Sequence, residues 1–91
     1  CAQLMNYKAA TLCDRGLPYG SESNQAKWLA GHAAAQATDR AMQTMGGMGY
    51  SREYQVERLW RDARLFKAAP VSEEMVLNYV AQHDLGMPRS Y

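Results

Sequence analysis

A cluster of glycines interrupts the most helical part of this chain and determines where its longest helix must end. Gly46, Gly47 and Gly49 directly follow a segment in which alanine recurs at helical spacing. Because glycine lacks a side chain and adopts the backbone conformations that terminate helices, we expect a helix to stop here. Side chains do not shield the peptide N–H groups of such a turn, which suits an anionic group.

The spacing of apolar residues predicts helices throughout the 91-residue chain. We expect about four helices: one ending near Arg15, one from a cap at Ser21 or Ser23 to about Met45, one over 53–67, and one capped by Ser72 and ending at Leu85. No stretch alternates between apolar and polar residues for long enough to indicate a strand. The sequence therefore predicts an all-α fold, an up-and-down helical bundle that forms one domain over residues 1–91.

Two patterns on these helices predict contacts. Small side chains form a stripe on the second helix, against which a neighbouring helix can pack closely. The stripe consists of Ala26, Ala30, Ala33, Ala37, Ala41 and Thr44. On the third helix, Glu57 and Arg61 lie four residues apart, as do Arg58 and Asp62, which is the spacing of stabilising ion pairs.

Charge and cysteine content exclude several classes of function. Ten basic and nine acidic side chains nearly balance, whereas a nucleic-acid-binding protein carries a basic surface. Charged residues such as Lys27 and Asp39 interrupt every apolar run, so none approaches the length of a membrane span. Cys1 and Cys13 lie too far apart on one predicted helix to pair, and they match no metal-ligand spacing. We expect no metal site, no nucleic-acid partner and no membrane span, in a reducing intracellular environment.

The segment from Gln43 to Ala63 resembles the C-terminal helical domain of the flavin-dependent acyl-CoA dehydrogenases. The family pattern combines a glutamine, a Gly-Gly-x-Gly turn followed by an aromatic residue, a Glu-Tyr-x-Val-Glu-Arg run and an Arg-Asp-Ala run. Its positions in this chain are Gln43, Gly46, Gly47, Gly49, Tyr50, Glu53, Tyr54, Val56, Glu57, Arg58, Arg61, Asp62 and Ala63. The likeness fades after Phe66. Because the chain also begins at Cys1 within a predicted helix, we expect residues 1–91 to be a C-terminal fragment of a larger flavoenzyme.

The resemblance implies that the cofactor is FAD and assigns residues to it. In the family, this glycine turn contacts the pyrophosphate and adenosine part of FAD, largely the FAD of a neighbouring subunit. The implied FAD-binding residues are Gln43, Gly46, Gly47 and, through its hydroxyl, Ser72. The alternative explanation is that the glycines only terminate the helix, as glycine does at many helix ends.

The chain departs from the family pattern at the position of the catalytic base. In many members, Glu-Gly-Thr follows Arg-Asp-Ala at a fixed interval, and its glutamate removes the α-proton of the acyl thioester. The same interval here leads to Pro70, Val71 and Ser72. Proline cannot accept a proton, so we assign no catalytic residue within the chain. Glu73 and Glu74 are displaced along the helix, so the base lies on a helix outside the chain or the chemistry has diverged.

The resemblance also implies the activity of the whole protein. It predicts an FAD-dependent dehydrogenase that oxidises an acyl-CoA thioester to the α,β-enoyl-CoA and passes electrons to an electron-transferring flavoprotein. It implies a homo-oligomer, either a dimer or a tetramer, in the bacterial cytoplasm or the mitochondrial matrix. The fragment alone is expected to be inactive. Two alternatives stay open: an oxygen-using flavin oxidase or monooxygenase relative, which fits Pro70, and a purely structural helical assembly module.

Overall fold

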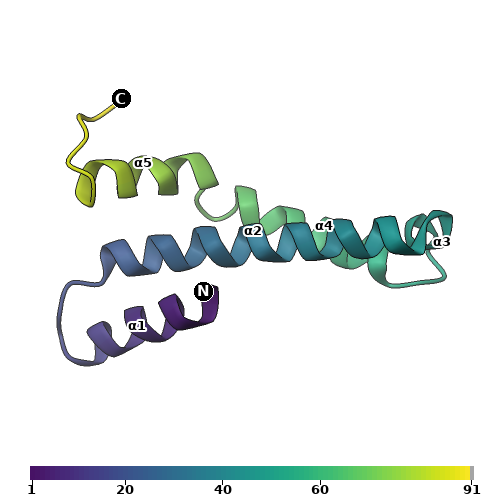
Figure 1. Ribbon diagram of the computed structural model, residues 1–91, viewed down its shortest axis with the longest axis horizontal. Helices are drawn as coiled ribbons and strands as arrows, with labels where there is room; N and C mark the ends of the chain where they lie inside the picture. The colour runs from purple at the N-terminus through teal and green to yellow at the C-terminus, as the bar shows by residue number, and fades with distance from the viewer. Residues whose placement is uncertain (91) are drawn as a thin grey trace.

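The computed structural model describes residues 1–90, and every regular element in that range is an α-helix (Figure 1). The helices are α1 (Ala2–Asp14), α2 (Gly20–Met45), α3 (Gly47–Tyr50), α4 (Val56–Ala68) and α5 (Glu73–His83). The predicted all-α class, with four long helices, is confirmed. The single turn α3 is an element that the sequence pattern did not predict.

The long helix α2 is the central element of the domain. α1 runs antiparallel to its first half, and α5 lies along the same half on the other side (Figure 1). The chain reverses at α3, so that α4 runs back along the second half of α2, and α5 continues in the same direction. Each of α1, α4 and α5 therefore packs against α2.

Few side chains of this domain are buried. The buried apolar residues are Ala9, Ala26, Ala63 and Val76, and Val76 is the one large side chain among residues 1–90 that is fully buried. The chain exposes 6771 Å², whereas a compact monomer of 10.2 kDa exposes about 5,300 Å². Its extents of 46 × 32 × 19 Å describe an open layer of helices with two broad faces.

The packing face of α2 differs from the predicted alanine stripe. Of that stripe only Ala26 is buried, and the exposed members are Ala30, Ala33, Ala37, Ala41 and Thr44. α4 packs on the adjacent row, where Gly31 is buried and a Cβ would lie 3.3 Å from the backbone oxygen of Phe66. The prediction was wrong because alanine occurs on both rows, and only the missing side chain at Gly31 lets the α4 backbone come this close.

The start of α2 does not use either of the predicted serine caps. α2 begins at Gly20 with Tyr19 at the cap position, and no side chain caps it. Ser21 donates a hydrogen bond to the carboxylate of Asp84, and Ser23 donates to the backbone oxygen of Gly20 at 3.1 Å. Both serines lie within the first turn, so Ser21 instead ties the start of α2 to the end of α5.

The starts of α4 and α5 depend on local serine contacts. α4 begins at Val56, three residues later than predicted, because Ser51 Oγ accepts the backbone N–H of Glu53 at 3.2 Å and holds the preceding segment in a turn. At the start of α5 the predicted cap is confirmed, since Ser72 Oγ accepts the N–H of Met75 at 3.4 Å. α5 ends at His83, two residues before the predicted end.

Ion pairs form on the surface of the helical layer. Three of them connect charged side chains of residues 1–90 at 2.9–3.0 Å: Lys8 with Glu22, Lys67 with Glu73, and Arg61 with Glu57. The last confirms one predicted pair on α4. Arg58, which was predicted to pair with Asp62, donates to Gln55 Oε1 at 2.9 Å instead. The hydrogen bond from Lys8 lowers the pKa of the Glu22 carboxyl.

Candidate functional site

The predicted glycine turn lies at one end of the layer, where α2 ends and α3 begins (Figure 1). Gly46 occupies the junction with φ 58° and ψ −139°, and its left-handed φ favours glycine. The Gly46 N–H donates to the Gln43 carbonyl at 3.3 Å, and the Gly46 carbonyl accepts the N–H of Gly49 at 3.0 Å. The turn is therefore sharp and is held by its own backbone.

The three glycines of the turn have different structural requirements. A Cβ on Gly49 would lie 2.9 Å from the backbone oxygen of Met42, so α3 packs on α2 only without a side chain there. Gly46 is required by its φ. Gly47 has neither constraint, because its φ is not left-handed and a Cβ would meet no other atom of residues 1–90 within 4 Å. The missing side chain at Gly47 leaves open space that an outside group can enter.

The residues next to Gly47 offer hydrogen-bond donors. Gln43, on the last turn of α2, is exposed, and its side chain makes no hydrogen bond with residues 1–90. Gly47 and Met48 begin α3, and amides in the first turn of a helix lack partners within that helix. An exposed amide side chain and helix-initiating peptide groups can together donate hydrogen bonds to a phosphate.

Ser72 lies in the connection between α4 and α5, where its hydroxyl is already engaged as the cap of α5. Glu74 is close by. Its own backbone N–H and the Ser72 hydroxyl lower the pKa of the Glu74 carboxyl, so this side chain is an anion with weakened affinity for a proton. Glu73 is occupied by its ion pair with Lys67 at 3.0 Å. Neither carboxylate is placed as a free proton acceptor.

The structure does not bring Ser72 next to the glycine turn. α4 lies between them, and its 13 residues form about 20 Å of helix. In Figure 1 the turn marks one end of the layer, whereas the connection between α4 and α5 lies well back along α2. Within one chain, the predicted FAD-binding residues therefore form two separate places: Gln43, Gly46 and Gly47 at one, and Ser72 at the other.

Pro70, at the position of the family base, borders an apolar hollow between α2 and the end of α4. The hollow has a volume of about 370 Å³, and its walls include Ala30, Ala34 and Phe66. Lys27 also lines it, with its Nζ donating to the Phe66 carbonyl at 3.1 Å. No carboxylate of residues 1–90 lines this hollow, so it holds no proton acceptor from that part of the chain.

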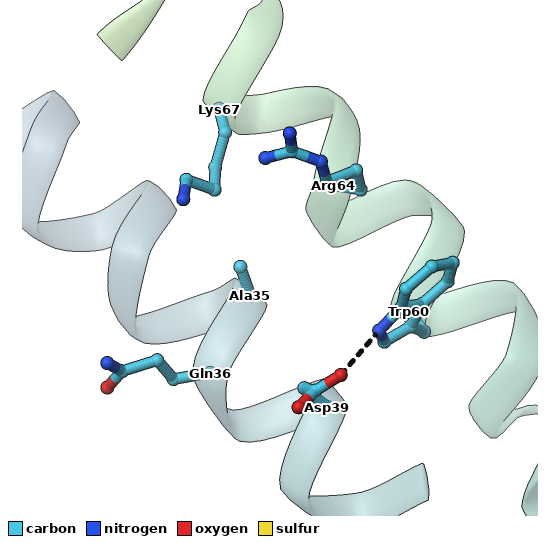
Figure 2. A pocket seen from close by; sticks show the side chains of 6 residues that line it. All are labelled: Ala35, Gln36, Asp39, Trp60, Arg64 and Lys67. Carbon is cyan, nitrogen blue, oxygen red and sulfur yellow. Dashed lines mark hydrogen bonds between the residues drawn. The ribbon is translucent and has the colours of Figure 1, made fainter.

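A second cleft, between α2 and α4, was not predicted from the sequence (Figure 2). The indole Nε1 of Trp60 donates to Asp39 Oδ1 at 3.1 Å and closes one end. Arg64 and Lys67 extend from α4 at the other end, and Ala35 lies between them on α2. The cavity measures about 230 Å³. Asp39 and Arg64 are distant in sequence and line the same cleft only because α2 and α4 pack antiparallel, so no local pattern indicated the cleft.

The described helices carry neither a metal cluster nor a membrane span. Among residues 1–90, no three His, Cys, Asp or Glu side chains lie close enough together to hold a metal ion. No helix in that range is both long enough and apolar enough to cross a membrane. His32 stacks on Trp28 with ring centroids 5.3 Å apart, and His83 contacts Tyr79 with centroids 4.2 Å apart. Both histidines are thus packing partners of aromatic rings.

Comparison with known proteins finds relatives across nearly the whole chain. The family model described as "Acyl-CoA dehydrogenase, C-terminal domain" matches residues 1–85. Acyl-CoA dehydrogenase FadE12 of Mycobacterium tuberculosis (strain ATCC 25618 / H37Rv) is 51% identical over 92 aligned residues, covering 99% of this chain and 24% of that protein. The short-chain specific acyl-CoA dehydrogenase, mitochondrial, of Bos taurus is 40% identical over 89 residues, covering 98% and 22%. The short/branched chain specific enzyme, mitochondrial, of Rattus norvegicus is 35% identical over 82 residues, covering 90% and 19%.

These matches identify the family of the chain. The chain belongs to the acyl-CoA dehydrogenase family, and its fold is that of the family's C-terminal helical domain. It spans about a fifth to a quarter of the length of these relatives. The resemblance drawn from the segment between Gln43 and Ala63 is confirmed.

Proposed function

We propose that this chain is the C-terminal domain of an FAD-dependent acyl-CoA dehydrogenase. The complete enzyme oxidises an acyl-CoA thioester to the α,β-enoyl-CoA, and FAD, when bound, supplies the hydride acceptor. The domain contributes part of the FAD site and part of the contact surface of a homo-oligomer, a dimer or a tetramer. Membership of the family supports this reaction class.

Gly47 is the observation that carries the FAD-binding role of the turn. Neither backbone conformation nor packing within residues 1–90 accounts for the missing side chain, whereas a phosphate that approaches the peptide groups does. Gln43 adds an exposed amide donor on the same turn. In the family this turn contacts the FAD of a neighbouring subunit, and about 20 Å of helix separates it from Ser72, so we assign the two places to different FAD molecules of the oligomer. The turn contacts the FAD of a neighbouring subunit.

The proton acceptor of the reaction is assigned to a residue outside residues 1–91. Pro70 borders a hollow without a carboxylate, and the lowered pKa of Glu74 favours its role at the α5 start over proton transfer. This domain therefore binds and orients, and another part of the enzyme removes the α-proton. The proposed electron acceptor is an electron-transferring flavoprotein, and the proposed location is the bacterial cytoplasm or the mitochondrial matrix.

Flavin retention by the intact protein tests the role of the turn. Gly47→Glu places a carboxylate in the open space, where it blocks a phosphate and repels it, so the purified variant should lose bound FAD. Gly47→Ala is the graded comparison, because its methyl group adds no charge but occupies part of the space that the phosphate would enter, so it should lose less flavin than Gly47→Glu. The measurement is the ratio of flavin to protein absorbance after purification. A full complement of FAD in Gly47→Glu would refute the assignment.

Pro70 favours a second candidate function. An oxygen-using oxidase or monooxygenase with the same fold needs no thioester base, which fits a proline at this position. Anaerobic mixing of the intact protein with acyl-CoA separates the two candidates. Rapid bleaching of bound flavin supports the dehydrogenase, whereas no bleaching by any thioester together with oxygen-dependent turnover supports the oxygen-using relative. A purely structural module would retain no flavin.

A further inference from the structure

The cleft between α2 and α4 holds two opposite charges without ion-pair partners (Figure 2). Arg64 makes no hydrogen bond or ion pair with residues 1–90, and its charge acts on the Glu74 carboxyl only from beyond ion-pair distance. Asp39 accepts the indole N–H of Trp60 through Oδ1, which leaves Oδ2 without a partner from that range. Lys67, the other cation of the cleft, is paired with Glu73 at 3.0 Å. One cation and one anion thus remain unpaired around the same cavity.

Both unpaired charges lie on the side of the layer that carries Gln43. Gln36, Asp39 and Gln43 follow each other on α2 at intervals of three and four residues, which makes them neighbours on the helix surface. Trp60 and Arg64 line the same cleft from α4. If Gln43 contacts the FAD of a neighbouring subunit, as the proposed function holds, a second copy of the protein reaches this side of α2.

A patch with one unpaired cation and one unpaired anion can pair with a copy of itself. Across a two-fold axis, each charge meets the opposite charge of the other copy, so two ion pairs form together. Ala35 contributes only a methyl group to the cleft, and Trp60 is 36% exposed, so a side chain of the second copy has room and an aromatic wall to pack on. Tryptophan and arginine are the side chains most enriched at the energetic centres of protein interfaces.

We propose that the cleft between α2 and α4 is a two-fold contact between copies of this protein, in which Arg64 of each copy pairs with Asp39 of the other. The Trp60 hydrogen bond positions the Asp39 carboxylate for this contact and leaves Oδ2 to accept from the guanidinium. Reciprocal charge pairs of this kind determine the orientation in which two surfaces meet, because every other orientation leaves the charges unpaired or opposed.

Charge reversal in the intact protein tests the contact. Arg64→Asp leaves two acidic side chains at the cleft, with Lys67 still paired to Glu73, and Asp39→Arg makes the cleft wholly basic, so each variant alone brings like charges together across the axis. Each should raise the dissociation constant of the oligomer about tenfold or more, measured by sedimentation over a range of concentrations. Arg15→Glu, an equivalent reversal in the exposed turn after α1, is the control and should leave the dissociation constant unchanged.

Mixing the two variants distinguishes pairing between copies from pairing within one chain. An acidic cleft and a basic cleft complement each other, so the mixture should assemble although neither variant assembles alone. Undiminished assembly of Arg64→Asp, or weakened single variants that do not recover on mixing, would overturn the proposal. Circular dichroism checks folding. If Asp39→Arg unfolds because Trp60 loses its acceptor, unchanged assembly of Arg64→Asp still refutes the contact, and weakened assembly supports it.

Flavin content measured on the same samples separates this proposal from the proposed function. If the wild-type protein binds FAD and the variants assemble normally, the two-fold contact is refuted and the proposed function stands. If the wild-type protein contains no FAD, the proposed function is refuted. The sedimentation results alone then test the two-fold contact.

Discussion

Replacing the glycines of the turn one at a time separates a packing requirement from a ligand requirement. In Gly49→Ala the added Cβ would lie 2.9 Å from the carbonyl oxygen of Met42 and 3.1 Å from both the Met42 Cα and the Met45 Cβ. Backbone atoms cannot rotate away, so α3 has to move off α2. Overpacking of this kind costs about 1–3 kcal/mol. Since each kcal/mol lowers Tm by about 4–8 °C in a domain of 60–100 residues, we expect a loss of several degrees or more for this helical domain.

Gly47→Ala is the matched comparison, because the same atom is added two residues away in the same short helix. Its Cβ meets no other atom of residues 1–90 within 4 Å, and its φ is not left-handed. We therefore expect the free energy of unfolding to change by less than about 0.5 kcal/mol. Thermal unfolding of the FAD-free protein, followed by circular dichroism, compares the two variants without a contribution from ligand binding.

Either of two results would refute this reasoning. An unchanged Tm in Gly49→Ala would mean that α3 does not pack on Met42 as the structure describes. A loss in Gly47→Ala as large as that in Gly49→Ala would mean that the turn itself requires glycine at residue 47. The open space beside Gly47 would then no longer point to an outside group.

Two further predictions concern stability. Ser72→Ala removes the acceptor of the Met75 N–H and should destabilise the protein by about 1 kcal/mol, whereas Ser72→Asp keeps an acceptor and should lose much less. Equal losses in the two thermal unfolding curves would contradict the capping role. Lys8 lowers the pKa of Glu22 from its ordinary value of 4.5, so this pair contributes stability above that pH, and the contribution is lost as pH falls through the lower folded value. The stability advantage of the wild type over Glu22→Gln should therefore shrink as the pH is lowered from about 6 to about 3 in a series of unfolding measurements. A pH-independent difference would refute the linkage.

Two features of the fold that depend on local chemistry were predictable from the sequence. The Ser72 cap is a contact between residues three apart, and the end of α2 follows from the φ that Gly46 alone adopts easily. The row of α2 that packs against α4 was not predictable, because it depends on how closely the Phe66 backbone approaches Gly31. Such an approach is a property of the assembled helices, and alanine spacing does not encode it.

The candidate site likewise has one part that the sequence predicts and other parts that it does not. The glycine turn was evident because its residues lie close together in the sequence, whereas the separate requirements of Gly46, Gly47 and Gly49 depend on the atoms packed around each of them. The cleft with Asp39 and Arg64 left no pattern in the sequence, since these two residues line one cleft only through the antiparallel packing of α2 and α4. The separation between Ser72 and the turn likewise follows from the length of α4 and its direction.

The thinness of the helical layer changes how sequence variants in this domain should be interpreted. In most proteins an exposed side chain tolerates substitution, because nothing but water touches it. Here many large apolar side chains are exposed, among them Phe66 at 59% and Leu77 at 45%, and exposed apolar surface is the kind that another polypeptide covers. Damaging variants will therefore cluster at residues that resemble surface in the single chain, although their exposure in the domain alone suggests that they tolerate change.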